Sequence, residues 1–386
     1  MKNLVLLAAL AALVVGCKKK KPEEGVMPAG SGQAMGSGGA MGSAMGSGGA
    51  MGSGSAAMGS GSAAAPMTGD DIAKRFTQCW GFFNDNKWDD FKGCYASDVV
   101  YEMPGGSMPP SNGADATVEG AKGFKAAFPD AKGDTQLVLV NGHSLVGVSL
   151  ITGTNSGEMK MGAMTMPATN KKIGLYIAQV LDLADGGQAK HVWEFIDLGT
   201  MMGQLKPDPK HPVRPVVDKL AMPMEVVVAK DDATEKANVE VAKKMMDAFD
   251  KHDAKALAEV VADDVVWSEQ AAPKDMTKKE LIPNAKAFWK AFSDAKLSVA
   301  SQWAAGDYVA TVGTLDATNT GDLPEMHLKK TGKHVSVPYL AIDKIADGKI
   351  KAFWLFEQGM AFAEQLGLMP PAPAGGGAGS GSAAKK

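Results

Sequence analysis

Two cysteines fall where they could form a disulfide bond. Cys79 lies in an expected helix over residues 70–84, and Cys94 lies near the end of a short second helix over 87–96. Turn-forming residues at 84–87 fall midway between the two cysteines. An antiparallel pair of helices would bring the two sulfur atoms level, so we predict a Cys79–Cys94 disulfide, with two buried thiols as the alternative.

Groups that could bind a metal, a phosphate or a nucleic acid are sparse. The histidines show no metal-ligand spacing, and the sequence has no phosphate-binding glycine loop, nucleophile elbow or Cys–His pair. Methionines 159, 161, 164 and 166 are better explained as apolar contacts along a strand than as a soft-metal site. Only Arg75 and Arg214 of the 40 basic residues are arginine. We therefore expect no metal, no cofactor and no nucleic-acid partner.

The first 17 residues have the pattern of an export signal. A lysine precedes an apolar stretch from Leu4 to Val15, which is too short to span a bilayer. The stretch ends in Val14-Val15-Gly16-Cys17, which resembles a bacterial lipobox. Lipidation of Cys17 would anchor the protein to a membrane of the cell envelope, and Lys18 favours the outer membrane or the cell surface over the inner membrane. Export to an oxidising compartment also favours the disulfide.

The two ends of the chain differ in composition from the middle. After the signal, the tripeptide Met-Gly-Ser recurs at 35, 41, 45, 51 and 58. Such a segment buries too little apolar surface to offset its ordering entropy, so we predict a disordered tether. The tail from Pro370 is rich in Pro, Gly, Ala and Ser and is also predicted to be disordered.

The middle of the chain contains an internal repeat. The segment FKAAFPDAK at 124–132 matches FWKAFSDAK at 288–296, and Thr-Asn-Ser-Gly at 154–157 matches Thr-Asn-Thr-Gly at 318–321. Both matches have an offset of 164 residues. We therefore divide the chain into a signal peptide (1–17), a tether (18–69), domain 1 (70–206), a linker (207–233), domain 2 (234–369) and a tail (370–386).

Each copy has the same expected order of elements. Three helices are expected at 70–84, 87–96 and 119–129 in domain 1, and at 234–251, 254–263 and 278–293 in domain 2. A β-rich segment precedes the third helix, and four strand-like runs follow it. Helices followed by an antiparallel meander indicate an α+β fold rather than βαβ units.

Several short motifs, in this order and seen twice, resemble the SnoaL-like polyketide-cyclase and ester-cyclase family of the nuclear-transport-factor-2-like superfamily. They are AFPDAK and AFSDAK, Gly-Thr-Asn-Ser-Gly at 153–157, Gly-Asp-Tyr-Val-Ala at 306–310, and a closing Trp…Gln-Leu pattern. The resemblance implies two tandem cone-shaped α+β barrels, each a curved antiparallel sheet around helices. It also implies one pocket per barrel for an apolar or amphipathic small molecule.

The resemblance also implies a carboxylate on the last strand as general acid/base. By spacing, Asp197 takes that place, on the strand face that also carries Trp193. Burial beside an apolar pocket would raise its pKa and suit it to proton transfer. The alternative is a helix N-cap, a common role for aspartate between a strand and a helix. In domain 2 the matching residue is Gln358, which cannot transfer a proton.

The family histidine of the Gly-Thr-His-x-Gly motif is Asn155 in domain 1 and Asn319 in domain 2. An amide keeps hydrogen bonding but loses proton transfer, which weakens the case for catalysis. The other pocket candidates are Tyr101, Thr154, Trp193, Trp267, Tyr339 and Trp354. For Tyr101, Thr154, Trp267 and Tyr339, a place in the core or the wall is the favoured interpretation.

The sequence leaves three hypotheses for function, and whether the protein is an enzyme stays open. The favoured one is a lipid-anchored protein that binds an unknown small molecule with little or no catalysis. The second is a cyclase or isomerase that uses Asp197 in domain 1. The third is a structural envelope protein whose two modules form an intrachain pseudo-dimer, although pairing between chains would also suit the fold.

Overall fold

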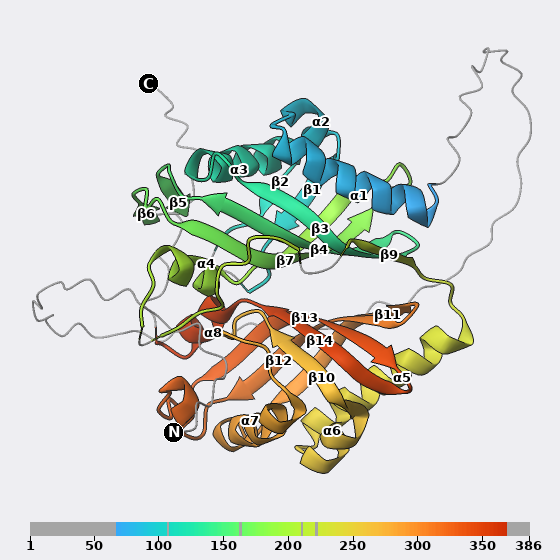
Figure 1. Cartoon of the computed structure of the whole chain (residues 1–386), viewed down its shortest axis with the longest axis vertical. Coiled ribbons are helices and arrows are strands. Elements are labelled where there is room, and N and C mark those ends of the chain that lie inside the picture. The colour runs from blue at the N-terminus through green and yellow to red at the C-terminus, as the bar shows by residue number, and fades with distance from the viewer. Residues whose placement is uncertain (1–66, 106–107, 162–163, 210, 221–222, 369–386) are drawn as a thin grey trace, which may run out of the picture. The chain divides into compact units, whose positions relative to one another are not determined.

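The computed structural model describes residues 67–105, 108–161, 164–209, 211–220 and 223–368. The predicted signal peptide, the lipidation site Cys17, almost all of the tether and the tail lie outside the described residues. No helix among the described residues is long and apolar enough to cross a membrane. Both repeats fold as sheet-and-helix modules in the predicted tandem order (Figure 1).

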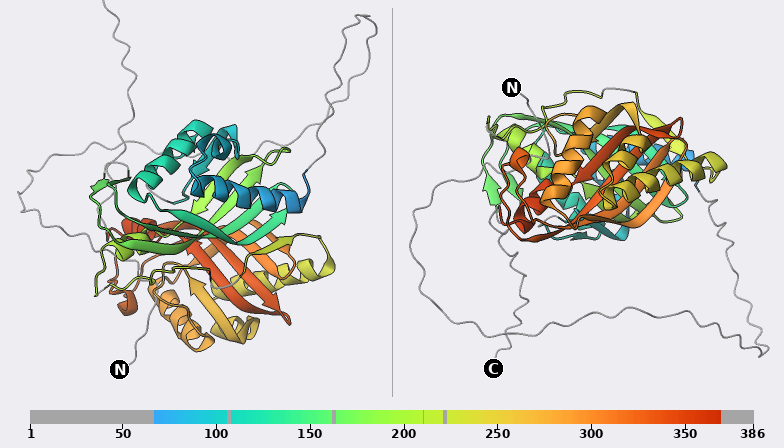
Figure 2. Two further views of the ribbon diagram at one scale, coloured as in Figure 1. Left: turned by 45° about the horizontal axis from the view of Figure 1, so that its top comes forward. Right: turned by 90° about the horizontal axis from the view of Figure 1, so that it is seen from below.

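Domain 1 begins with three helices, interrupted by one strand and a short bridge. Its elements are α1 (Gly69–Asn84), α2 (Trp88–Lys92), β1 (Tyr95–Glu102), β2 (Ser111–Asn112), α3 (Ala114–Ala127), β3 (Lys132–Asn141), β4 (Ser144–Thr154), β5 (Met159–Met161), β6 (Met164–Met166), β7 (Lys172–Leu183), β8 (Ala189–Phe195) and α4 (Leu198–Leu205). Helix α1 starts at a capping box, in which Thr68 and Asp71 satisfy each other's backbone N–H groups. The helices cover one face of the sheet (Figures 1 and 2).

The linker contains one short strand, β9 (Glu225–Val228). Domain 2 follows with α5 (Ala233–Asp250), α6 (Ala254–Val260), β10 (Val261–Glu269), α7 (Lys278–Ala291), β11 (Lys296–Ala305), β12 (Tyr308–Thr318), a 3₁₀ turn η1 (Pro324–Met326), β13 (His334–Ala346), β14 (Lys349–Glu357) and α8 (Gly359–Gln365). The third helix of domain 1 begins five residues earlier than the 119 expected from the sequence, and Ala114, Thr117 and Val118 in this additional part are buried.

The sheets share one strand order. Domain 1 has the order β2-β1-β8-β7-β4-β3-β9, and domain 2 has β10-β14-β13-β12-β11. Neighbouring strands within each meander are antiparallel, as expected, but the first strand of each domain pairs in parallel with the last one. The linker strand β9 also runs parallel to β3. The sequence predicts a wholly antiparallel sheet, and this prediction is wrong for these parallel pairs. The first strand can run parallel to the last because the chain crosses the helical layer before the meander starts.

The two faces of each sheet pack against different partners. One face contacts the helices of the same domain, where the apolar clusters of that domain lie. The other face contributes to an apolar cluster that contains side chains of both sheets. Its fully buried members are Leu139, Val146, Ala178, Phe195, Ala305, Tyr308, Ala310, Leu340, Ile342 and Phe356.

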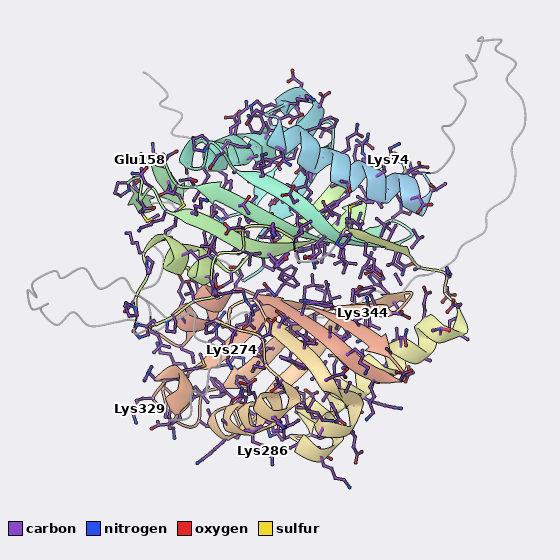
Figure 3. The ribbon with its side chains drawn as sticks, in the orientation of Figure 1. Lys74, Glu158, Lys274, Lys286, Lys329 and Lys344 are labelled. Carbon is purple, nitrogen blue, oxygen red and sulfur yellow. A yellow bond between two sulfur atoms is a disulfide. The ribbon has the colours of Figure 1, made fainter. Side chains whose placement is uncertain are left out.

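Polar contacts surround this shared cluster. The hydroxyl of Tyr308 donates to Glu225 on β9 at 2.6 Å, and the ammonium group of Lys344 donates to the Tyr308 hydroxyl at 2.8 Å. Lys344 is labelled in Figure 3 beside β13 and β14. Arg214 of the linker donates to Asp275 at 2.8 Å and to the backbone oxygen of Glu269 at 2.9 Å.

Candidate functional site

Alternate side chains of β8 and the residue after it lie on opposite faces of the domain 1 sheet. Val192, Glu194 and Ile196 line a cavity on the helix side. Trp193 packs against the cluster shared by the two sheets, and Phe195 belongs to it. A carboxylate at position 194 therefore lies inside the domain, whereas residues 193 and 195 face the second sheet.

The cavity of domain 1 has a volume of about 380 Å³. Helices α1, α2 and α3 and strands β1, β4, β7 and β8 all contribute to its lining. Most of the lining is apolar or aromatic, including Phe76, Trp80, Phe91, Tyr95 and Ile177. A cavity of this size and composition suits a small organic molecule.

A cluster of three polar side chains projects into this apolar cavity. Glu194 Oε2 accepts a hydrogen bond from Gln179 Nε2 at 2.8 Å and another, short one from the hydroxyl of Tyr101. Gln179 Nε2 also donates to the Tyr101 oxygen at 3.0 Å. Among the described residues, no donor is found for the other carboxylate oxygen, Oε1. Gln179 Oε1 likewise accepts no hydrogen bond from the described residues, so the cluster has two oxygens that a ligand could use.

Burial controls the protonation of this cluster. Desolvation raises the pKa of Glu194 above its usual range, and the hydrogen bonds from Tyr101 and Gln179 partly oppose this effect. Burial and the nearby Glu194 carboxylate also raise the pKa of Tyr101, so the phenol stays protonated and acts as a donor. A carboxyl group with a raised pKa can give or take a proton near neutral pH.

Asp197 adopts the capping role that the sequence left open as its alternative. It precedes α4, and its side chain accepts the backbone N–H of Thr200 at 2.7 Å. Asp197 is buried, which raises its pKa, but it is not among the residues that line the cavity. Gln358 has the matching position before α8 and does not line the cavity of domain 2 either.

The two asparagines of the repeated motif hold loops together. Asn155 donates to the backbone oxygen of Gly157 at 2.9 Å and accepts from the backbone of Thr169 at 2.9 Å. Asn319 makes the equivalent contacts with Gly321 at 2.8 Å and Thr331 at 2.6 Å. Both are fully buried and lie outside the cavity linings. Neither is a pocket residue, because every polar atom of the amide is used by the backbone.

The remaining pocket candidates divide into two groups. Tyr101 lines the domain 1 cavity, and Trp267 and Tyr339 line the domain 2 cavity. Thr154 is outside, because its N–H and hydroxyl both donate to Asp130, at 2.6 and 2.8 Å. Trp193 and Trp354 are also outside, since both pack against the apolar cluster between the sheets.

Sequence reasoning missed Glu194 and Gln179, which complete the polar cluster with Tyr101. The available signal was an acid between apolar residues, in Val-Trp-Glu-Phe at 192–195, since an acid is rarely buried without a partner. Strand pairing brings the two residues opposite each other, because Gln179 of β7 pairs with Glu194 of β8.

Domain 2 lacks this cluster although its strands keep the same register. Ala341 pairs with Leu355 at the position where Gln179 pairs with Glu194 in domain 1. Trp267 occupies the position of Tyr101, because each residue lies at the same register of the parallel pairing with the last strand of its domain. The two cavities therefore differ in chemistry, although the fold that encloses them is the same.

The domain 2 cavity is smaller, at about 130 Å³, and has acidic groups of its own. Glu269, Glu357 and Asn284 line it together with Trp267 and Tyr339. Burial raises the pKa of Glu269 to about 7 and that of Glu357 to about 8, and for Glu357 the neighbouring carboxylates Glu269 and Asp197 add to the effect.

The predicted cysteine pair is bonded in the structure. Cys79 of α1 and Cys94 are joined by a disulfide with a Cα–Cα distance of 6.1 Å. Both cysteines line the domain 1 cavity, so the bond ties two of its walls together. No group of three His, Cys, Asp or Glu side chains that could hold a metal ion occurs among the described residues.

A family model described as SnoaL-like polyketide cyclase matches residues 70–205 and 239–366 of the chain. No curated protein matches the chain. Similar solved structures include AclR from Streptomyces galilaeus, at 24% identity over 36% of this chain and 86% of that one, with a TM-score of 0.33. IdmH from Streptomyces antibioticus is 20% identical over 34% of this chain and 98% of that one, with a TM-score of 0.31. TsrD from Streptomyces laurentii has 16% identity over 36% and 100%, with a TM-score of 0.32.

Proposed function

This chain belongs to the SnoaL-like polyketide cyclase family in two tandem copies, and on that premise we propose that domain 1 binds a small amphipathic molecule. The observation that carries the proposal is the 380 Å³ cavity with mostly apolar walls and a hydrogen-bonded polar cluster of Glu194, Gln179 and Tyr101. Apolar walls bind the body of a ligand, and a few placed polar groups fix its orientation.

The cluster indicates the polar group of the ligand. The free oxygen Oε1 of Glu194 accepts a hydrogen bond when it is ionised, and the carboxyl donates one when it is protonated. Burial favours the protonated form of this carboxyl, because desolvation raises its pKa. A ligand with one hydroxyl or carbonyl group on an apolar ring system therefore fits the cavity.

A cavity-filling variant tests this proposal. Ala121 lies on α3 and lines the cavity, whereas Ala126 lies on the same helix with its side chain exposed and outside the lining. The full chain would be purified from its native organism, denatured and extracted with solvent, and the released small molecules identified by mass spectrometry. Wild type and Ala126→Trp should release the same amphipathic compound, and Ala121→Trp should not. Equal release from all three proteins, or no release from the wild type, would refute the proposal.

A second candidate function is proton transfer to or from the bound molecule by Glu194. Its support is the burial of this carboxyl in the cavity beside Tyr101 and Gln179, since desolvation raises its pKa and makes the carboxylate a stronger base. The ionised carboxylate would remove a proton from carbon next to a ligand carbonyl and return it elsewhere. Deuterium exchange at that carbon of a cyclic ketone such as 2-tetralone, followed by NMR in D₂O, measures this activity. Acceleration by the wild type but not by Glu194→Gln would support catalysis, and equal rates would exclude it for this substrate.

The same proposal places the protein on a membrane of the cell envelope. Its support is the signal-like segment that ends at Cys17, outside the described residues. Diacylation of Cys17 would hold both domains near the membrane surface, outer membrane or cell surface being favoured. Cys17→Ser should shift the protein from the membrane fraction to the soluble fraction and remove the mass of the lipid. An unchanged distribution would contradict the lipoprotein assignment.

A further inference from the structure

We propose that the domain 2 cavity binds a small aliphatic ammonium ion, held by the buried acceptors Glu269, Glu357 and Asn284 and enclosed by aromatic and methionine side chains. This site is separate from the domain 1 cavity and does not depend on the function proposed for it. The argument rests on unpartnered acceptors, on the charge of the lining and on the shape of the walls.

Two of the side chains that line the cavity have an acceptor atom without a donor among the described residues. Glu269 uses Oε1 to accept from the indole N–H of Trp267 at 3.0 Å, but Oε2 is buried and has no hydrogen-bond partner among the described residues. Asn284 donates to the sulfur of Met276 at 3.0 Å. Its Oδ1 is also buried and has no hydrogen-bond partner among the described residues. The exposed fractions of Glu269, Glu357 and Asn284 are 7%, 7% and 2%. Buried acceptors of this kind are costly unless a donor reaches them.

The charge of the lining selects a cation. Two carboxyl groups line the cavity, and no lysine, arginine or histidine does. Arg214 is the nearest opposing charge, and its guanidinium is engaged by Asp275 at 2.8 Å and by the backbone oxygen of Glu269 at 2.9 Å. On the other side, Asp197 adds negative charge near Glu357. An ammonium group would supply both the donors and the positive charge that these groups lack.

The walls suit the apolar part of such an ion. Phe249, Trp267, Phe288, Phe353 and Phe362 line the cavity with Met245. Aromatic faces attract cations, and methionine adapts to irregular apolar shapes. The volume of about 130 Å³ restricts the occupant to a few non-hydrogen atoms, since a water molecule occupies roughly 30 Å³ in the liquid.

Protonation of the carboxyls lowers the cost of burying this pair. Burial raises the pKa of Glu269 to about 7 and that of Glu357 to about 8. The groups that face this pair are Asp197, which opposes ionisation, Arg214, which favours it, and the phenol of Tyr339. An entering cation would displace protons from the pair, so its affinity should rise as the pH increases from about 6 to 8 and binding should release protons to the buffer.

The test compares tert-butylammonium with its neutral isostere tert-butanol. The ammonium head offers three N–H donors for the acceptors, whereas the alcohol offers one donor and no charge. Isothermal titration calorimetry on the full chain at pH 8 should give an affinity at least about tenfold higher for the ammonium ion, as expected for charge-assisted hydrogen bonds. Titrations in buffers of different ionisation enthalpy should reveal proton release.

Variants assign the binding to this cavity. Glu269→Gln and Glu357→Gln keep the side-chain shape and should each weaken tert-butylammonium binding by about tenfold or more. The control is Glu259→Gln, which removes an exposed carboxylate from the same domain and should leave the affinity unchanged. Equal binding of the amine and the alcohol by the wild type, or equal weakening by Glu259→Gln, would overturn the proposal. If a cavity variant does not fold, the indole N–H resonance of Trp267 in the wild type decides, because it must shift on titration with the amine.

Discussion

Replacing Asp343 with asparagine should remove a large part of the pH dependence of the unfolding free energy. Asp343 lies in β13, paired with Val309 on one side and Phe353 on the other. Its exposed fraction is 0%, and neither carboxyl oxygen has a hydrogen-bond partner among the described residues. Burial therefore raises its pKa from 3.8 to about 7.

The magnitude follows from this difference in pKa. Between pH 3.8 and about 7 the folded protein holds a proton on Asp343 and the unfolded chain does not. Stability contributed by the protonated carboxyl is thus present at low pH, falls as the pH rises through this window and is lost above it. Since one pKa unit is worth about 1.4 kcal/mol, the full loss is roughly 4 kcal/mol, of which roughly 3 kcal/mol falls between pH 5 and pH 8.

Urea unfolding of the full chain at pH 5 and pH 8 measures this effect. The fall in unfolding free energy between the two pH values should be smaller by roughly 3 kcal/mol in Asp343→Asn than in the wild type. Asp343→Leu copies Leu181 at the matching position of domain 1 and should raise stability at pH 8. Asp307→Asn, which changes an exposed carboxylate, is the control. A fall in Asp343→Asn as large as in the wild type would refute the reasoning.

Three further predictions concern domain 1. Tyr101→Phe removes a donor from the ionised Glu194 and should raise its pKa further, measured by NMR of ¹³C-labelled glutamate; an unchanged value would contradict the hydrogen-bonded cluster. Cys79→Ser opens the disulfide to Cys94, which spans 15 residues, and should lower the unfolding free energy by about 3 kcal/mol; equal stability would show that the bond is not formed. Asn155→Ala leaves buried backbone groups without hydrogen-bond partners and should lower the unfolding free energy by about 2 kcal/mol or more, measured by thermal or urea unfolding. An unchanged unfolding free energy would show that the side chain does not hold these loops together.

The order of elements could be predicted because it rests on local pattern and on repetition. Apolar spacing and turn residues placed the helices and strands of both domains within a few residues, and the repeat doubled the evidence. The Cys79–Cys94 pairing could also be anticipated, since a turn midway between two helices places the two thiols opposite each other.

The sequence could not predict which residues of the last strand, β8, face the cavity. Alternation divides β8 into two sets, but both faces of this sheet are covered, one by helices and one by the second sheet. With apolar residues on both faces, the pattern does not tell which set lines the cavity. This is why Trp193 was chosen and Glu194 was missed. The parallel pairing of β1 with β8 is likewise a long-range contact that no local pattern encodes.

The most direct test of the account is the affinity of the full chain for 2-naphthol and for naphthalene, measured by fluorescence titration of the wild type and of Glu194→Leu. This substitution copies Leu355, the matching residue of domain 2. The account predicts that the wild type binds 2-naphthol at least about tenfold more tightly than naphthalene and that Glu194→Leu loses this preference. Equal binding of the two compounds by the wild type, or an unchanged preference in Glu194→Leu, would contradict a domain 1 site built around Glu194.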